Sequence, residues 1–304
     1  MKRPDDKAAK AVNAAAKAAK ASSPIELPPE VRPGQSVALL QELHILTRDG
    51  KLNQDSRRKL KQVYHLVQFI EPLIREIEQD HPQVSLVDHG AGKSYLGFIL
   101  YDLFFKHRAD GSCIYGIETR EELVTKSQEL AARLDFPGMR FLNLSVAEST
   151  DSSALPARID IVTALHACNT ATDDAIDFAL KKKAKFMVLV PCCQAEVASV
   201  LKKNKGRDLG RSALTEIWRH PLHTREFGSQ ITNVLRCLQL EAHGYQVNVT
   251  ELVGWEHSMK NELIVASYKD LPRKRPSERL QEVLVTLGLE EMGQRFYTQQ
   301  LERA

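Results

Sequence analysis

The sequence has little of what marks membrane, secreted or disulfide-rich proteins. Its 304 residues contain no uninterrupted apolar run near the ~18–20 residues of a membrane span, and the amino terminus has no hydrophobic signal segment. The five cysteines are an odd set without framework spacing, so we expect reduced thiols in a cytoplasmic protein. Neither sign of charge dominates, because 42 Lys and Arg face 39 Asp and Glu, for a net charge of +3. The whole molecule is therefore not a general binder of polyanions.

What is present is typical of a globular protein, with 43% hydrophobic and 27% charged residues. We predict four regions: a flexible Ala- and Lys-rich tail with a Pro-containing linker (1–36), an N-terminal helical region (37–81), an α/β domain (82–270) and a C-terminal helical extension (271–304). The tail has helix propensity but no apolar face to bury. It is therefore either a solvated arm or an arm that attracts phosphate.

A basic helix is predicted immediately before the α/β domain. Between residues 55 and 80, apolar side chains recur at intervals of three and four, and Asn53 or Asp55 is available as the cap. Cations occupy its first turns, where they oppose the helix dipole. The candidates for substrate binding among them are Arg57, Arg58 and Lys61. These residues either meet an anionic substrate or form an ordinary solvated face.

From residue 82 onward, short apolar segments alternate with helical ones. The predicted strands cover 84–88, 112–117, 139–144, 158–165, 185–190, 245–253 and 262–268. The predicted helices cover 93–106, 121–135, 172–183, 229–243 and 277–290. This pattern indicates an α/β fold with a mostly parallel seven-stranded sheet. Only about nine residues join the last two strands, too few for a parallel crossover, so one strand should run antiparallel.

The turn after the first strand is a candidate ligand site, because open parallel sheets bind ligands at the carboxyl ends of their strands. It reads Asp88-His89-Gly90-Ala91-Gly92. A phosphate loop would need glycine where Val87 stands, and a dinucleotide fingerprint would need glycine where Tyr95 stands. The phosphate loop therefore fails on these residues, and the dinucleotide fingerprint is a weak match.

S-adenosylmethionine fits the turn better. Asp88 supplies negative charge for its ammonium group, and the glycine backbone accommodates its methionyl portion. Glu118 follows the second strand, where a carboxylate can accept both ribose hydroxyls, and the segment ending at Val146 can frame adenine. The predicted cofactor residues are Asp88, His89, Gly90, Ala91, Gly92, Glu118, Val146 and Leu165. The alternative is that Asp88 and Glu118 are only turn or capping residues.

Three motifs occur in one order: the segment Asp88–Leu96, the segment Leu165–Cys168 followed by Thr172-Asp173, and the segment Pro191–Gln194. Over about residues 55–268 the chain resembles a class I methyltransferase family that includes the eukaryotic tRNA 2′-O-methyltransferases and related methyltransferase-like proteins. The resemblance implies a Rossmann-like sheet, S-adenosylmethionine as cofactor and RNA, either tRNA or rRNA, as substrate. Asn169 stands where relatives often have Gly, and Gln194 where the tRNA enzymes have His. The zinc-finger modules of those enzymes are absent from the sequence.

A second constellation follows the fourth and fifth predicted strands: His166, Cys168, Cys192 and Cys193. Those strands should be neighbours, so the four side chains should converge near the methyl group of the cofactor. We predict His166 and Cys192 as catalytic residues. His166 either touches the cofactor or accepts the substrate proton, with a structural role as the alternative, and Cys192 is a candidate nucleophile for attack at a pyrimidine carbon. Buried packing remains an alternative for the cysteines. Zinc is less favoured, because adjacent cysteines are poorly spaced to chelate it, and we expect no metal.

Trp218 and Arg219 complete the predicted substrate residues. Trp218 either stacks on a base or belongs to the core. Together these observations predict a methyltransferase dependent on S-adenosylmethionine that acts on RNA. The alternatives are a methyltransferase for a protein or small molecule, and a non-catalytic module that binds RNA or protein. The sequence does not determine the oligomeric state.

Overall fold

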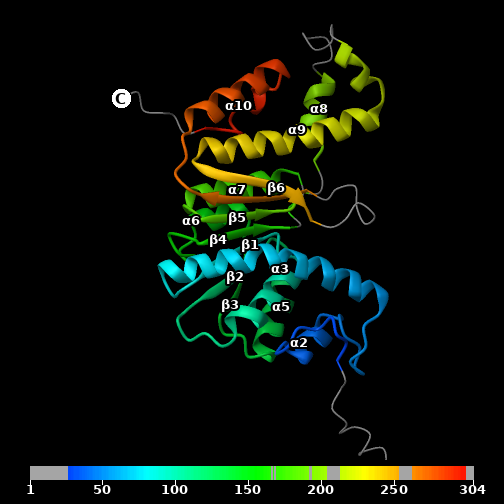
Figure 1. Ribbon diagram of the computed structural model, residues 1–304, viewed down its shortest axis with the longest axis vertical. Helices are drawn as coiled ribbons and strands as arrows, with labels where there is room; N and C mark the ends of the chain where they lie inside the picture. The colour runs from blue at the N-terminus through cyan, green and yellow to red at the C-terminus, as the bar shows by residue number, and fades with distance from the viewer. Residues whose placement is uncertain are drawn as a thin grey trace, which may run out of the picture. The chain divides into compact units, whose positions relative to one another are not determined.

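A computed structural model describes residues 27–165, 167, 169–191, 194–203, 213–252 and 262–298 (Figure 1). Its centre is a seven-stranded sheet of order β3-β2-β1-β4-β5-β7-β6. The strands are β1 (Ser85–His89), β2 (Cys113–Glu118), β3 (Met139–Asn143), β4 (Ile161–Ala164), β5 (Phe186–Leu189), β6 (Tyr245–Glu251) and β7 (Glu262–Tyr268). Strands β1 to β5 pair in parallel, and β7 is antiparallel to both β5 and β6. The predicted class I methyltransferase fold, with one reversed strand, is confirmed.

Nine α-helices occur in the described part of the chain. They are α2 (Val37–Glu42), α3 (Gln54–Asp80), α4 (Tyr95–Leu100), α5 (Glu121–Arg133), α6 (Val146–Asp151), α7 (Thr170–Lys181), α8 (Glu196–Lys203), α9 (Pro221–Ala242) and α10 (Lys274–Thr286). A π-helix η1 (Tyr101–Phe105) continues α4, and two 3₁₀ helices are η3 (Ala213–Arg219) and η4 (Glu290–Met292). In the described part of the chain, none of the helices has the length and apolar character that a bilayer crossing requires.

Several helix limits differ from those predicted. The predicted helix over 229–243 begins eight residues earlier, because Pro221 takes the first helical position, where its fixed φ and missing N–H are tolerated. The short helix α6 was not predicted. It begins with a capping box, in which the Ser145 hydroxyl accepts from the Glu148 amide and Glu148 accepts from the Ser145 amide.

The described chain divides into two compact units after Leu60. In the first unit, Ser36 caps α2 by accepting from the Leu39 amide at 3.2 Å. Asn53 caps α3 by accepting from the Ser56 amide at 2.7 Å, as one of the two predicted caps. The first unit therefore holds its helix starts with local side-chain hydrogen bonds.

The second unit contains the sheet and two apolar clusters. In one cluster, buried residues of α7 such as Ile176 and Phe178 pack on strand residues such as Val87 and Met187. The other joins α8, α9 and α10 around Leu235, Leu280 and Leu284, among others. The described strand residues of β1, β2, β4 and β5 are almost entirely buried. The carboxyl ends of these strands are therefore fixed in position by a packed core.

Candidate cofactor and active site

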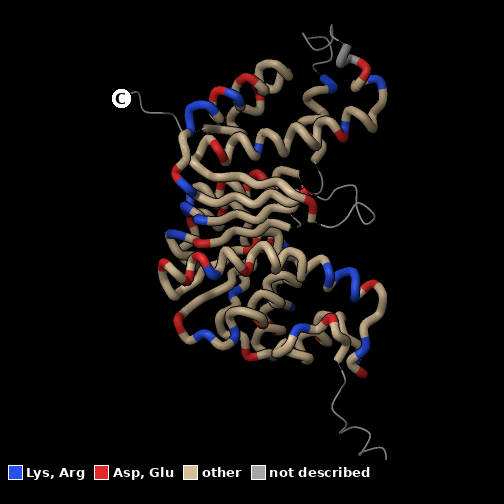
Figure 2. The backbone as a smooth tube through the Cα atoms, viewed as in Figure 1, with Lys and Arg blue, Asp and Glu red and all other residues tan. Residues whose placement is uncertain are grey.

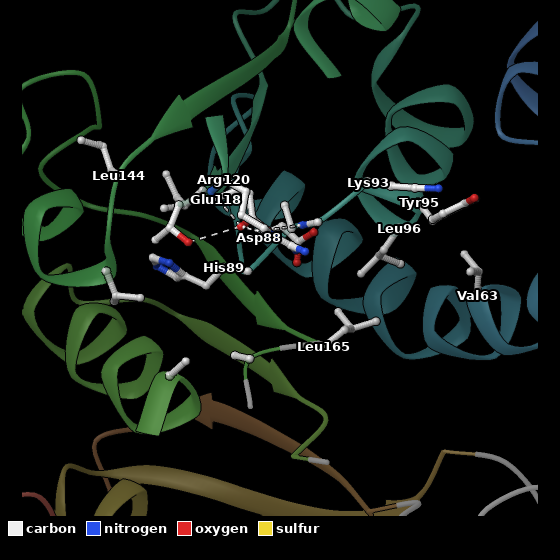
Figure 3. A pocket seen from close by; sticks show the side chains of 18 residues that line it. Val63, Asp88, His89, Lys93, Tyr95, Leu96, Glu118, Arg120, Leu144 and Leu165 are labelled. Atoms are coloured by element: carbon white, nitrogen blue, oxygen red, sulfur yellow. Dashed lines mark hydrogen bonds and ion pairs between the residues drawn. The ribbon is translucent and has the colours of Figure 1, made fainter. Parts of the chain in front are cut away.

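A cavity of about 520 Å³ lies at the carboxyl ends of β1, β2 and β4. Every predicted cofactor residue, from Asp88 through Leu165, is among the residues that line it. Figure 3 shows Asp88, His89 and Glu118 near its middle, with Leu144 toward one end and Lys93, Tyr95 and Val63 toward the other. The fold therefore brings residues from separate parts of the sequence to one cavity.

The turn after β1 depends on two glycines with left-handed backbones. Gly90 has φ +64° and Gly92 has φ +58°, a region in which other residues are strained. The Ala91 amide donates to the Ile117 carbonyl at 3.1 Å, which ties the turn to β2. With no side chains at these two positions, a ligand can approach the backbone closely.

Asp88 is buried against β4. It is 4% exposed, and the Thr163 hydroxyl donates to its Oδ1 at 2.7 Å. Burial raises the pKa of Asp88 to about 7, although the hydrogen bond from Thr163 acts in the opposite direction. A cationic ligand group beside this carboxyl would favour its ionised form.

Glu118 has more donors than Asp88. Its Oε2 accepts from the Gly92 amide at 2.9 Å and from Arg120 Nη2 at 3.1 Å. Its Oε1 accepts from the Arg120 amide at 3.1 Å and from Arg120 Nε at 3.0 Å. Burial alone would raise the pKa of Glu118, but these hydrogen bonds outweigh it and hold the pKa below its ordinary value. Glu118 is therefore ionised at neutral pH.

His89 is fully buried and lines the same cavity. Its ring meets the Phe178 ring edge-on, with 4.4 Å between centroids. Burial lowers the pKa of His89 to about 3, so the imidazole is neutral, and neither ring nitrogen has a hydrogen-bond partner among the described residues. A buried polar group without a partner is costly, so these nitrogens fit a polar ligand in the cavity.

Apolar side chains form the remaining walls. Leu144 comes from the segment between β3 and α6, and Val146 is the first residue of α6. Leu165 and Ala167 follow β4, and Ala171 lies at the start of α7. Such a wall suits a flat ring, and the carboxylates beside it suit hydroxyl and ammonium groups.

The predicted catalytic residues His166 and Cys192 lie outside the described residues, as do Cys168 and Cys193. Their roles, and the zinc alternative, therefore stay predictions. Strands β4 and β5 are parallel neighbours, with Ala164 paired to Leu189. The predicted adjacency of the two strands that precede these residues is confirmed.

The predicted substrate residues do not share one environment. Arg57 pairs with Glu30 at 3.2 Å and Arg58 with Asp55 at 3.8 Å, and both are exposed. Lys61 is exposed two residues before Val63, which lines the cavity. Arg219 is exposed and pairs with Glu216 at 3.0 Å.

The prediction that Trp218 stacks on a base is wrong for this structure. Its side chain is 7% exposed and belongs to the apolar cluster of α8, α9 and α10. The indole ring meets the Phe227 ring edge-on at 5.5 Å between centroids. Trp218 is therefore a core residue, the other predicted alternative. Burial of its large aromatic ring is favourable, and the buried ring face is not available to a base.

Sequence reasoning missed three residues that shape the cavity. Arg120 holds Glu118, and Thr163 holds Asp88. Asn143 donates to the Glu118 carbonyl at 3.0 Å and so fixes the end of β2. Arg120 could have been found from the sequence, because it is a cation only two residues after Glu118. Thr163 could be found only from the strand register, which pairs it with Asp88.

Comparisons with known proteins agree with this architecture. Residues 58–200 match a family described as a methyltransferase domain. The chain is 24% identical to a "Glutathione S-transferase C-terminal domain-containing protein" of Xenopus laevis, over 72% of this chain and 36% of that protein. The human protein of that name is 25% identical, over 72% of this chain and 34% of its own length. The chain thus spans about a third of the length of the curated relatives it matches.

Among solved structures, a methyltransferase of Podospora anserina with bound SAH has a TM-score of 0.45 at 11% identity, covering 89% of this chain and 99% of that one. Magnesium protoporphyrin IX methyltransferase of Synechocystis has a TM-score of 0.41 at 16% identity, covering 76% and 94%. Residues 58–200 are thus similar to a methyltransferase domain, and the strand order agrees with the predicted fold. The narrower resemblance to tRNA 2′-O-methyltransferases is not among these findings.

Proposed function

We propose that the cavity binds S-adenosylmethionine and that the protein transfers its methyl group to RNA. Asp88 faces the ammonium group, Glu118 accepts from the ribose hydroxyls, and the turn from Gly90 to Gly92 lies along the methionyl portion. Leu144 and Val146 cover the adenine. The observation that carries this proposal is the joining of all these residues in one cavity of about 520 Å³.

The chemistry of the cavity fits this cofactor. A buried carboxyl with a pKa near 7 accommodates a cation, and a second, ionised carboxylate accommodates hydroxyl donors. The volume lies within the ~300–1,000 Å³ of ordinary ligand sites. When bound, the cofactor supplies a methyl group on a positively charged sulfur. The work of the protein is then to align the acceptor with that carbon and to exclude water.

Catalytic roles are proposed for two residues of the turns after β4 and β5. His166 would accept the proton that the acceptor releases, because the pKa of an ordinary histidine is near neutrality. Cys192 would act only if the acceptor atom is a pyrimidine carbon, where a covalent adduct activates the ring. Direct transfer to an oxygen or nitrogen needs no such adduct.

RNA, either tRNA or rRNA, is the proposed acceptor. Figure 2 shows Lys and Arg gathered at the first turns of α3 and at the start of α10. The exposed cations Arg57, Arg58, Lys61 and Arg219 would contact phosphates, the sequence-independent part of RNA binding. The resemblance to RNA-modifying enzymes supports the same acceptor. The cytoplasmic location stays a prediction.

Two experiments test the proposal in order. Isothermal titration with S-adenosylhomocysteine should give saturable binding, and no binding would contradict the enzyme and its cofactor together. Labelled S-adenosylmethionine should then methylate total RNA from a strain lacking the gene more than RNA from the wild-type strain. Equal labelling of both RNA pools would instead favour a protein or small-molecule acceptor. Binding without transfer to any of these would favour the non-catalytic module.

A further inference from the structure

Arg236 of α9 is a fully buried arginine beside the active-site end of the sheet. Its Nε donates to Asp173 Oδ1 at 2.5 Å, and its Nη2 donates to the Asn169 carbonyl at 3.0 Å. Its Nη1 donates to Asn233 Oδ1 at 3.2 Å. One guanidinium thus donates to three acceptors. Its N–H donors have a fixed planar arrangement that suits this role, whereas a lysine ammonium lacks that arrangement.

Asn233 extends the network to two more segments. Its Oδ1 also accepts from Gln194 Nε2 at 2.7 Å, and its Nδ2 donates to Glu262 Oε2 at 2.6 Å. Gln194 lies in the turn after β5, and Glu262 is the first residue of β7. Through Asn233, Arg236 is therefore joined to the turns after β4 and β5 and to the start of β7.

Asn169, the residue before α7, is held in a strained conformation. Asn169 has φ +53° and ψ −122°, a combination that suits glycine and strains other residues. Such strain persists only when the surroundings fix it, and the bond from Arg236 to the Asn169 carbonyl does so. The Thr172 hydroxyl adds a bond to the Ala167 carbonyl at 2.5 Å within the same turn.

This turn is also a wall of the cavity. Leu165, Ala167 and Ala171 line the cavity. In the sequence they lie before and after Asn169, the residue whose carbonyl Arg236 binds. Arg236 itself does not line the cavity, so its influence on a ligand must pass through the turn. The charge of Arg236 is balanced by the buried Asp173, which also lies 3.9 Å from Arg295.

We propose that Arg236 is a positioning residue for the methyl-transfer site. It holds the strained turn after β4 against the cofactor, and with Asn233 it couples that turn to the one after β5. This inference rests on the proposed function, because the cavity must hold the cofactor. Without the Arg236 guanidinium, the cavity wall formed by Leu165 and Ala167 would fluctuate, and the cofactor would bind less tightly.

The test uses Arg236→Lys, which keeps a positive charge beside Asp173 but loses the planar set of N–H donors that reaches Asn169 and Asn233. We expect affinity for S-adenosylhomocysteine to fall about tenfold by titration calorimetry. Amide hydrogen exchange in the segment 164–172 should become faster. Asn233→Ala, which removes the link to Gln194 and Glu262 but keeps the ion pair, should have a smaller effect of about threefold. Both measurements are made well below the melting temperature of each variant.

Two further variants separate positioning from general stability. Leu284→Ala cuts a buried side chain in α10, away from the cavity, and should lower the melting temperature while leaving affinity and segment 164–172 unchanged. Asn169→Gly removes the backbone strain, so adding it to Arg236→Lys should restore much of the affinity.

The outcomes are distinct. Wild-type affinity and exchange in Arg236→Lys would overturn the inference, as would an equal loss of affinity in Leu284→Ala. Failure of the wild-type protein to bind S-adenosylhomocysteine would overturn the proposed function. In that case, faster exchange in segment 164–172 of Arg236→Lys would still support the fixing of the turn, and unchanged exchange would overturn it.

Discussion

Asp88 and Glu118 end neighbouring strands and line one cavity, yet their pKa values move in opposite directions. Both side chains are nearly inaccessible to solvent, at 4% and 7% exposure, but Asp88 lies deeper in the protein, so burial raises its pKa more. Asp88 accepts one hydrogen bond, from Thr163, and its pKa rises to about 7. Glu118 accepts from Gly92, Thr119 and Arg120, and its pKa falls. Depth of burial and the donors around each carboxylate together decide which one is ionised, and no cation of the described residues pairs with Asp88, so a ligand can supply that partner.

Removing the charge of Asp88 should have the largest effect. Asp88→Asn keeps the shape and an acceptor for Thr163 but loses the attraction to the ammonium group of the ligand. We expect affinity for S-adenosylhomocysteine to fall about 100-fold, the upper range for a hydrogen bond to a charged group. Titration calorimetry measures it, with the exposed Asp151→Asn as the matched control. Unchanged affinity in Asp88→Asn would mean that the ammonium group lies elsewhere.

The pH dependence of binding should be the next largest effect. Below a pKa of about 7, Asp88 is protonated in the free protein and must lose its proton before it can attract a cation. Affinity should therefore rise with pH, by about tenfold per unit at pH values well below 7, and level off above it. Titrations between pH 5.5 and 7.5 measure the slope. Asp88→Asn should abolish it, and a slope that survives in that variant would assign the proton to another group.

Glu118 should show a smaller effect with little slope. Glu118→Gln removes one good acceptor for the ribose hydroxyls, so we expect about tenfold weaker binding. Because the pKa of Glu118 lies below its ordinary value, this loss should be nearly the same at pH 6 and pH 7.5. A loss confined to one end of that range would show that the two carboxylates titrate together rather than separately.

The stability of the ligand-free protein should change with the opposite sign. A raised pKa in the folded state means that Asp88 favours folding at low pH and that this contribution is lost as pH rises through about 7. At pH 8 the ligand-free Asp88→Asn protein should therefore be more stable than the wild type, by roughly 1–4 kcal/mol. Thermal unfolding at pH 5 and pH 8 measures it. A variant less stable than wild type at pH 8 would contradict the raised pKa.

Local patterns predicted much of this fold, because strands and helices each have a characteristic spacing of apolar residues within a short sequence segment. The segment 262–268 matches β7 residue for residue, and its short connection fixed its direction. The start of α9 was missed because a proline within a polar segment gave no apolar period to follow. Trp218 was left between two alternatives, since an aromatic residue beside an arginine has the same local appearance in a core and on a surface.

From the sequence alone came the strand segments, the reversed strand, the adjacency of the fourth and fifth strands and eight of the residues that line the cavity, because hydrophobic periodicity and the position of a residue at a strand end are local properties. Only the tertiary structure decided which carboxylate is ionised and which turn is strained and held. The partners involved are far apart in the chain: Thr163 lies 75 residues from Asp88, and Asp173 lies 63 residues from Arg236. Such pairs depend on strand register and helix packing, and no spacing within the sequence encodes them.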